Sequence, residues 1–247
     1  MIGNDGAVNF QSLETTGGAP WPKVAARGIA ANSCPGIIAF VGSDGSGKST
    51  LARTAQEECA ACGIPAQVVW SRFNNFLSKP LLALARVTGH SRREVHDGVT
   101  FGYHNFRGAV FLRHPFIALQ TLDVNLAAAM KARLAGKQAG ILIFERSAWD
   151  TLADVILDTG CDRLAVNAWG RWMTASVSGR GPVLWVSRSK ASILATRPEL
   201  KHDRLLDEKI ALYGRLAAVH GWHRIDNSRS LDEAKADVRE QVRRLVA

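Results

Sequence analysis

The residue pattern that most constrains the fold of this chain lies at residues 42–50, which read GSDGSGKST. Three glycines within six positions let the backbone turn so tightly that successive N–H groups point inward, towards a bound anion. An apolar run precedes this segment and a helical pattern follows it. This is the context in which the spacing G-x-x-x-x-G-K-[ST] cradles phosphate groups. The sequence therefore predicts a P-loop between a strand and a helix.

Short apolar runs alternate with longer amphipathic stretches after residue 35, as is typical of βα units that form a parallel sheet covered on both faces. We therefore predict an α/β P-loop NTPase domain at residues 36–247, built on a five-stranded parallel sheet with helices on both faces. The expected strands are Gly36–Val41, Ala66–Trp70, Ile141–Phe144, Val183–Ser187 and Trp222–Ile225. The expected helices are Lys48–Ala61, Pro80–Val87, Phe116–Ala135, Ala148–Leu157, Asp162–Val177, Leu205–His220 and Leu231–Val246.

Residues 1–35 show no sustained period, and we expect them to form a flexible N-terminal leader. The chain contains 31 Lys and Arg residues against 22 Asp and Glu residues, an excess that suits a polyanionic partner, either nucleic acid or small nucleotides. No signal peptide is expected, because no apolar run follows a basic start, and no membrane span is expected, because charges interrupt the most apolar stretch. Only Cys59 and Cys62 of the four cysteines have CxxC spacing, so we expect reduced thiols and a cytoplasmic location.

The P-loop predicts that the chain binds ATP together with Mg²⁺. Lys48 is expected to reach the β- and γ-phosphates, and the Ser49 hydroxyl to bind the metal ion. P-loops serve many classes of enzyme, so the class has to come from other residues. The chain has no Asn-Lys-x-Asp motif of GTPases and no paired carboxylates after a strand, as expected in helicases. The predicted nucleotide-binding residues are Gly42, Ser43, Asp44, Gly45, Ser46, Gly47, Lys48, Ser49 and Thr50.

Three segments resemble the thymidylate kinase and deoxynucleoside kinase group. The loop with Asp44 and Gly45 inside it is similar to the thymidylate kinase form of the motif, and Phe144–Ser147, which reads FERS, resembles the Glu-Arg-Ser of deoxynucleoside kinases. The arginine-rich residues 188–204 resemble the basic lid of the family. The resemblance spans about residues 36–247 and implies a nucleotide kinase-like domain with a basic lid, which commonly forms a homodimer.

Phosphoryl transfer spreads negative charge over the transferred group, so a kinase needs positive groups that close around it. In the lid segment, Arg197 and Arg204 are the first candidates for such groups, and Arg188 and Lys201 are secondary candidates. The alternative interpretation of the whole segment is a solvated basic face. Structural roles also remain open for the other groups: an ion pair for Glu145 and Arg146, loop shaping for Asp44, and hydrophobic packing for Tyr103. The predicted catalytic residues are Lys48, Glu145, Arg146, Arg197 and Arg204. The predicted acceptor-binding residues are Asp44, Arg72, Tyr103, Glu145 and Arg146.

Two segments depart from the thymidylate kinase pattern. Residues 72–75 retain only the Arg of its Arg-Glu-Pro-Gly, and Thr121–Asn125 lacks the Arg of its Ala-Asp-Arg. The leading hypothesis is an ATP-dependent kinase that acts on a nucleoside monophosphate, a nucleoside or a related small metabolite. The alternatives are a nucleic-acid-associated P-loop ATPase or end-kinase, and a nucleotide-binding regulator without turnover. The scattered distribution of the basic residues disfavours a nucleic-acid partner.

Overall fold

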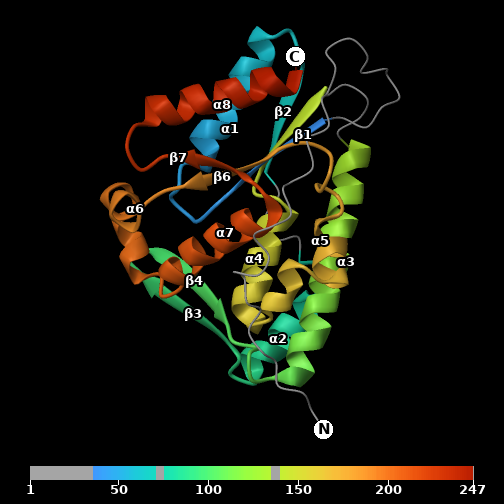
Figure 1. Ribbon diagram of the computed structural model, residues 1–247. Helices are drawn as coiled ribbons and strands as arrows, with labels where there is room; N and C mark the ends of the chain where they lie inside the picture. The colour runs from blue at the N-terminus through green and yellow to red at the C-terminus, as the bar shows by residue number, and fades with distance from the viewer. Residues whose placement is uncertain (1–35, 71–74, 135–139, 247) are drawn as a thin grey trace.

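The computed structural model describes residues 36–70, 75–134 and 140–246, and the expected leader lies outside this range (Figure 1). Five parallel strands form one sheet in the order β2-β5-β1-β6-β7. The predicted α/β class and the five-stranded parallel sheet are thus confirmed. The strands are β1 (Gly36–Val41), β2 (Ala66–Trp70), β5 (Ile141–Glu145), β6 (Val183–Ser187) and β7 (His223–Asp226).

Helices cover both faces of the sheet, as predicted. Two of them, α1 and α8, lie on one face, and α3, α4, α5 and α7 lie on the other (Figure 1). Among the described residues, no helix combines the length and the apolar character needed to cross a membrane. The eight helices of the described part are α1 (Lys48–Ala61), α2 (Lys79–Val87), α3 (Val110–Leu134), α4 (Ala148–Thr159), α5 (Ala168–Thr174), α6 (Lys190–Thr196), α7 (Leu206–His220) and α8 (Leu231–Val246).

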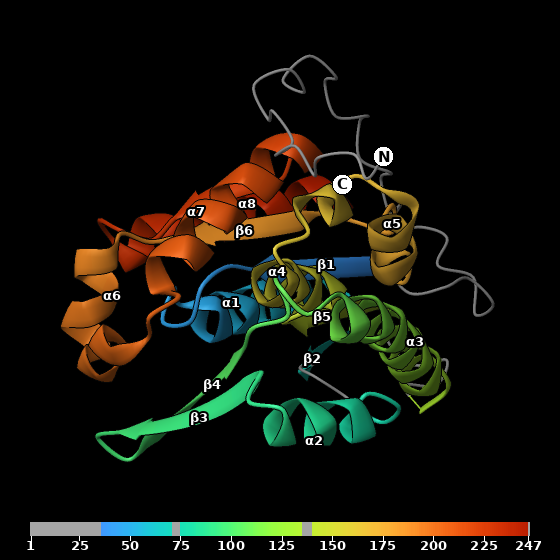
Figure 2. The ribbon, with the colours of Figure 1, turned by 90° about the horizontal axis from the view of Figure 1, so that it is seen from below.

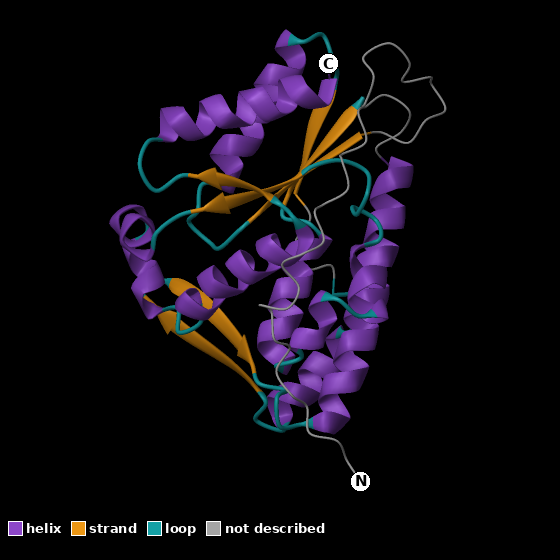
Figure 3. Ribbon diagram, in the orientation of Figure 1, coloured by secondary structure: helices purple, strands orange, loops and turns teal. Residues whose placement is uncertain are grey.

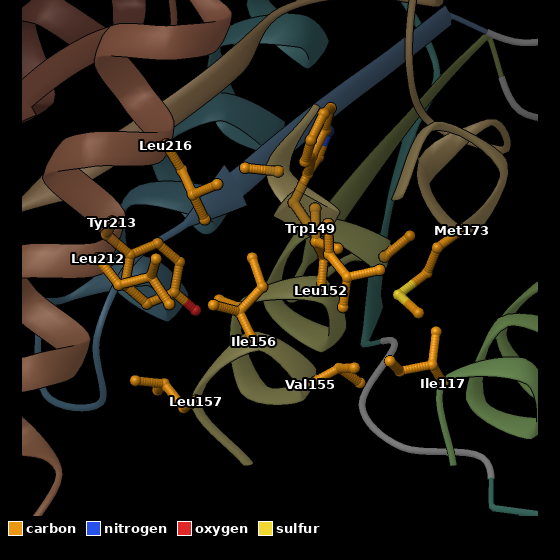
Figure 4. Close-up of a cluster of buried hydrophobic side chains, with 14 of the residues drawn as sticks. Ile117, Trp149, Leu152, Val155, Ile156, Leu157, Met173, Leu212, Tyr213 and Leu216 are labelled. Carbon is orange, nitrogen blue, oxygen red and sulfur yellow. The ribbon is translucent and has the colours of Figure 1, made fainter. Parts of the chain in front are cut away.

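The central strand β1 separates two hydrophobic cores. Its residues Ile38 and Phe40 pack with α1 and α8, whereas Ala39 and Val41 pack with the helices of the opposite face. Burial on both faces explains why the strand is apolar at successive positions. In the second core, side chains of α4 lie between those of α7 and those of α3 and α5 (Figure 4). Both cores hold β1 rigidly at the centre of the sheet.

Two helical predictions need correction. The helix expected to begin at Phe116 begins at Val110, so that Pro115 lies within its second turn. Pro115 therefore lies beyond the first turn, so the helix continues past a residue that has no N–H to donate to the carbonyl four residues before it. The helix expected over 162–177 is divided into a 3₁₀ turn at Asp162–Ala165 and α5. The division occurs because the Asn167 side chain accepts a hydrogen bond from the N–H of Gly170 and so starts a new helix.

A β-hairpin that the sequence pattern did not predict follows α2. It consists of β3 (Ser91–His96) and β4 (Val99–His104), and it stands apart from the main sheet (Figure 3). Asp97 and Gly98 form its turn, with φ values of 50° and 76°. An Asp-Gly pair between two extended segments favours such a two-residue turn, so the signal was present in the sequence.

The hairpin reaches across to the arginine-rich segment (Figure 2). Phe101 of β4 packs with Ile193 of α6, with Leu200 in the 3₁₀ turn Pro198–His202, and with Leu206 at the start of α7. These four residues are buried. The long insertion between β2 and α3 therefore supports residues 188–204 from one side.

Candidate functional site

The loop after β1 has a backbone that glycine alone adopts easily. Gly42, Gly45 and Gly47 have φ values of 147°, 78° and 101°. At Gly42, a Cβ atom would lie 2.6 Å from the carbonyl oxygen of Val186 in the neighbouring strand β6. The glycines therefore let the loop turn tightly against the carboxyl edge of the sheet, where α/β proteins bind ligands.

Lys48, the first residue of α1, folds back over this loop. Its Nζ atom donates hydrogen bonds to the carbonyl oxygens of Gly42, at 2.6 Å, and Ser43, at 2.7 Å. The N-cap of this helix is Gly47, which has no side chain to bond to the first N–H groups. The first turn of α1 thus directs backbone N–H groups and the positive end of the helix dipole towards the loop. A lysine, a helix start and a glycine-rich turn converge on one point.

Ser49 and Glu145 bring two adjacent elements together at this point. The Ser49 hydroxyl in the first turn of α1 donates a hydrogen bond to the carboxylate of Glu145, the last residue of β5. Thr50 follows in the same turn and is exposed. Hydroxyl and carboxylate oxygens are the ligands that Mg²⁺ prefers, so the pair has the chemistry of a magnesium site.

Arg146 forms an ion pair with Asp44 of the loop. The Arg146 backbone has a φ value of 67°, an uncommon conformation for a residue other than glycine. Ser147 follows it and starts α4 through a capping box with Asp150, which fixes the chain on that side. Strained backbones of this kind persist where the surrounding structure holds them, often at functional sites.

Two residues hold the loop from the opposite side, where β6 and β7 end. Arg188 donates from Nη1 to the carbonyl oxygen of Gly45, at 2.9 Å. Asn227 is buried and donates from Nδ2 to the carbonyl oxygen of Ser46, at 2.8 Å. The sequence pattern indicated Arg188 as a secondary candidate but gave no sign of Asn227, whose contact joins positions 181 residues apart. Only its place directly after a strand could have drawn attention to it.

The predicted lid arginines do not form one group. Arg197 pairs with Glu199 and lies beside Gly45, where its Cγ atom would be 3.5 Å from an added Cβ. Arg204 instead lies 3.2 Å from Glu94 of the hairpin, and its guanidinium is 6.0 Å from the centre of the Tyr103 ring. Arg197 is therefore part of the loop site, whereas Arg204 belongs to a second group.

Tyr103 is held in that second group by its hydroxyl, which donates to the carbonyl oxygen of His202 and accepts from the N–H of Arg204, both at 3.2 Å. Burial raises the pKa of the Tyr103 phenol, so that it stays protonated and can donate. Lys201 lies near the hairpin turn, 3.8 Å from Asp97. The structure thus places the aromatic residue predicted to contact the acceptor against the lid segment.

Arg72, one of the residues predicted to bind an acceptor, lies outside the described residues. Within the segment Thr121–Asn125, Asp123 accepts hydrogen bonds from the N–H groups of Leu77 and Ser78, at 2.7 and 3.0 Å, and from the Ser78 hydroxyl at 2.7 Å. Gln120 donates to the side chains of Asn75, at 2.7 Å, and Ser78, at 3.0 Å. This buried network ties α3 to the start of α2.

Comparison of the sequence with known families found no family model and no curated protein that matches it. Within the described ranges, no group of three or more His, Cys, Asp or Glu side chains is placed to hold a metal ion. The functional assignment therefore depends on the geometry of the loop, Ser49, Glu145 and Arg146.

Proposed function

We propose that this chain is an ATP-dependent kinase of the P-loop type, which transfers the γ-phosphate to a nucleoside monophosphate, a nucleoside or a related small metabolite. The observation that carries the proposal is the convergence of three features at the carboxyl edge of the sheet. These are the glycine-rich loop with Lys48, the Ser49–Glu145 pair and the Arg146–Asp44 pair. A phosphate-binding loop alone would fit many enzymes, but the two side-chain pairs add groups suited to transfer chemistry.

The loop and α1 supply the donors for the triphosphate. Backbone N–H groups of residues 42–50 and the ammonium group of Lys48 bind the phosphates. Lys48 exchanges its hydrogen bonds with the carbonyl oxygens of Gly42 and Ser43 for bonds to phosphate oxygens, because its ammonium group stands on a flexible stem. Ser49 and Glu145 hold Mg²⁺, which would neutralise charge on the phosphates. The proposed role of Glu145 is therefore to bind the metal ion.

Positive groups close around the transferred phosphate. Arg197 lies beside the loop and is half exposed, so its guanidinium can swing from Glu199 onto a phosphate. Arg188 supports the loop from beneath through its bond to Gly45. Guanidinium groups suit this task because their parallel N–H donors match phosphate oxygens. In this proposal, Arg197 moves onto the phosphate, whereas Arg188 stays bound to the loop.

The Arg146–Asp44 pair faces the acceptor in this proposal. Asp44 accepts a hydrogen bond from an acceptor hydroxyl, and Arg146 binds an acceptor phosphate where there is one. Their mutual ion pair keeps both side chains in place before the acceptor arrives. Arg72 is proposed as a further clamp. The acceptor is proposed to bind towards α2 and α3, which Asp123 and Gln120 tie together.

The test is transfer of labelled γ-phosphate from ATP to pooled nucleosides, nucleoside monophosphates and small hydroxylated metabolites, with and without Mg²⁺. The expected result is a labelled product that depends on Mg²⁺ and is lost in Lys48→Ala. Arg146→Gln should retain ATP binding but reduce transfer at least about tenfold, as loss of one charged contact to a reacting group does. Absence of product with every acceptor would contradict the kinase proposal.

Two alternatives remain, and each has its own observation. Salt-dependent binding of single-stranded DNA or RNA would favour a nucleic-acid-associated ATPase or end-kinase, for which the net charge of +9 is the only argument. ATP binding without transfer would favour a nucleotide-binding regulator. A homodimer and a cytoplasmic location remain predictions, and light scattering of the purified chain would test the first.

A further inference from the structure

A cavity of about 430 Å³ lies between the β3–β4 hairpin and the first turn of α7, and Leu157 at the end of α4 completes its wall. This volume is within the range of pockets that bind small molecules. We propose that the cavity binds the phosphate group of a small phosphate monoester, at a site separate from the glycine-rich loop. The proposal goes beyond the kinase activity and does not depend on it.

Charge supports an anionic ligand. Three arginines, Arg92, Arg107 and Arg204, contribute to the wall together with two carboxylates. Glu208 pairs with Arg107 at 2.8 Å, and Glu94 pairs with Arg204 at 3.2 Å. Arg92 has no carboxylate partner among the described residues, so the wall carries one uncompensated positive charge. An arginine that faces a cavity without a partner offers a two-pronged donor to phosphate oxygens.

The wall is also held in place before any ligand binds. Arg92 and Tyr103 are cross-strand neighbours in the hairpin, and Tyr103 is fixed by its two hydrogen bonds to the backbone of residues 202 and 204. Phe101 anchors the hairpin against α6 and α7. A preorganised wall lowers the entropic cost of binding. The planar ring of Tyr103 further suits a monoester whose organic part is apolar.

The position of the cavity separates it from the loop site. Helix α4 begins beside Arg146, and Leu157 lies ten residues after its N-cap Ser147. At 1.5 Å per residue, this wall of the cavity is about 15 Å along the helix from the loop site. A phosphate held there is too distant for transfer. Arg204 still links the cavity to the arginine-rich segment, so a bound monoester stabilises that segment against the hairpin.

The test is calorimetric titration of phenyl phosphate into the full chain with Lys48→Ala, which removes the strongest donor of the glycine-rich loop. Binding is expected, and Arg92→Gln added to this background should weaken it about tenfold, the loss expected for one charged hydrogen-bonded contact. Arg93→Gln is the matched control, because this exposed arginine is the next residue of the same strand and faces the other way. It should change the affinity less than about twofold.

Three results would overturn the proposal. Equal weakening by Arg92→Gln and Arg93→Gln would show that surface charge alone attracts the anion. Loss of all binding in the Lys48→Ala protein would place the anion in the loop. Equally tight binding of phenol would show that the ring, and not the phosphate, is recognised. Binding of inorganic phosphate with the same dependence on Arg92 would support the site and assign the affinity to the phosphate group.

Discussion

At the scale of single residues, the loop site is defined by groups that satisfy one another. Lys48 bonds to the loop carbonyls, Ser49 to Glu145, and Asp44 to Arg146. Paired polar groups keep their side chains in fixed positions, and each pair can open to a ligand that offers stronger partners. In the proposed function, ATP would therefore take the place of contacts that already exist, and we expect no change in the fold.

The variant Asn227→Ala tests whether the conformation of the loop affects ATP binding. In Asn227→Ala, the buried carbonyl of Ser46 loses its donor, which should cost about 1 to 2 kcal/mol of unfolding free energy and weaken ATP binding about fivefold. Asn167→Ala removes the N-cap of α5 and should cost about 1 kcal/mol without changing ATP affinity. Urea unfolding and ATP titration of both variants make the comparison. If Asn227→Ala binds ATP as tightly as Asn167→Ala does, the proposed role of Asn227 in shaping the loop is wrong.

Asp158, at the end of α4, gives a pH-dependent prediction. Burial, together with the neighbouring Asp154 carboxylate, raises the pKa of Asp158 well above its ordinary value of 3.8. The folded state therefore binds a proton more tightly than the unfolded state, and the stability contributed by this group falls as pH rises from about 4 towards the raised pKa. Asparagine does not titrate, so Asp158→Asn lacks this pH-dependent decrease. The free energy of unfolding of the variant minus that of the wild type should therefore increase as the pH rises.

Urea unfolding between pH 4 and pH 8 measures this difference. Asp232→Asn is the control, because the side chain of Asp232 is 94% exposed and its substitution should give a difference that hardly changes with pH. A pH-independent difference for Asp158→Asn would show that the carboxyl group titrates normally in the folded protein.

At the scale of elements, the β3–β4 hairpin and the arginine-rich segment form one unit. Phe101, Ile193, Leu200 and Leu206 make its apolar centre. Around it, Asp97 at the turn contacts His202 at 3.1 Å, and the His202 ring stacks on His96 with 4.7 Å between centres. The position of Arg197 beside the loop therefore depends in part on an insertion distant in sequence.

Phe101→Ala should separate these two elements. The loss of a buried aromatic ring is expected to cost about 3 kcal/mol and to speed amide hydrogen exchange over residues 190–206. Val95→Ala is the control, because Val95 lies in the same hairpin with its side chain 66% exposed, and should change stability by less than about 0.5 kcal/mol. Unchanged exchange in Phe101→Ala would mean that the segment holds its position without the hairpin.

The sequence predicted the elements whose patterns are local. The five strands were found within one residue at each end, because each is a short apolar run between polar or turn residues. The hairpin was missed because Arg92, Arg93 and Glu94 make β3 too polar to be recognised as a strand, although the Asp-Gly turn was visible. In the site, the loop could be located from its spacing, whereas the contacts of Asn227, Asp123 and Tyr103 depend on tertiary packing.

At the scale of the whole molecule, five parallel strands end at one edge, and the candidate site is assembled from residues at the carboxyl ends of four of them. The loop comes directly after β1, and Glu145 ends β5 with Arg146 next. Arg188 and Asn227 come directly after β6 and β7. A rigid sheet covered on both faces can hold such groups to within small distances, which transfer chemistry requires. The net charge of +9 suits a polyanionic ligand.

The central claim is that the loop at residues 42–50 binds ATP with Mg²⁺, and calorimetric titration of ATP tests it most directly. Wild-type protein should bind ATP more tightly with Mg²⁺ than without it, and Lys48→Ala should weaken binding about 100-fold. Lys79→Ala, at an exposed lysine of α2, should change the affinity less than about twofold. If the wild type does not bind ATP, or if Lys48→Ala binds as tightly as Lys79→Ala, the claim is wrong.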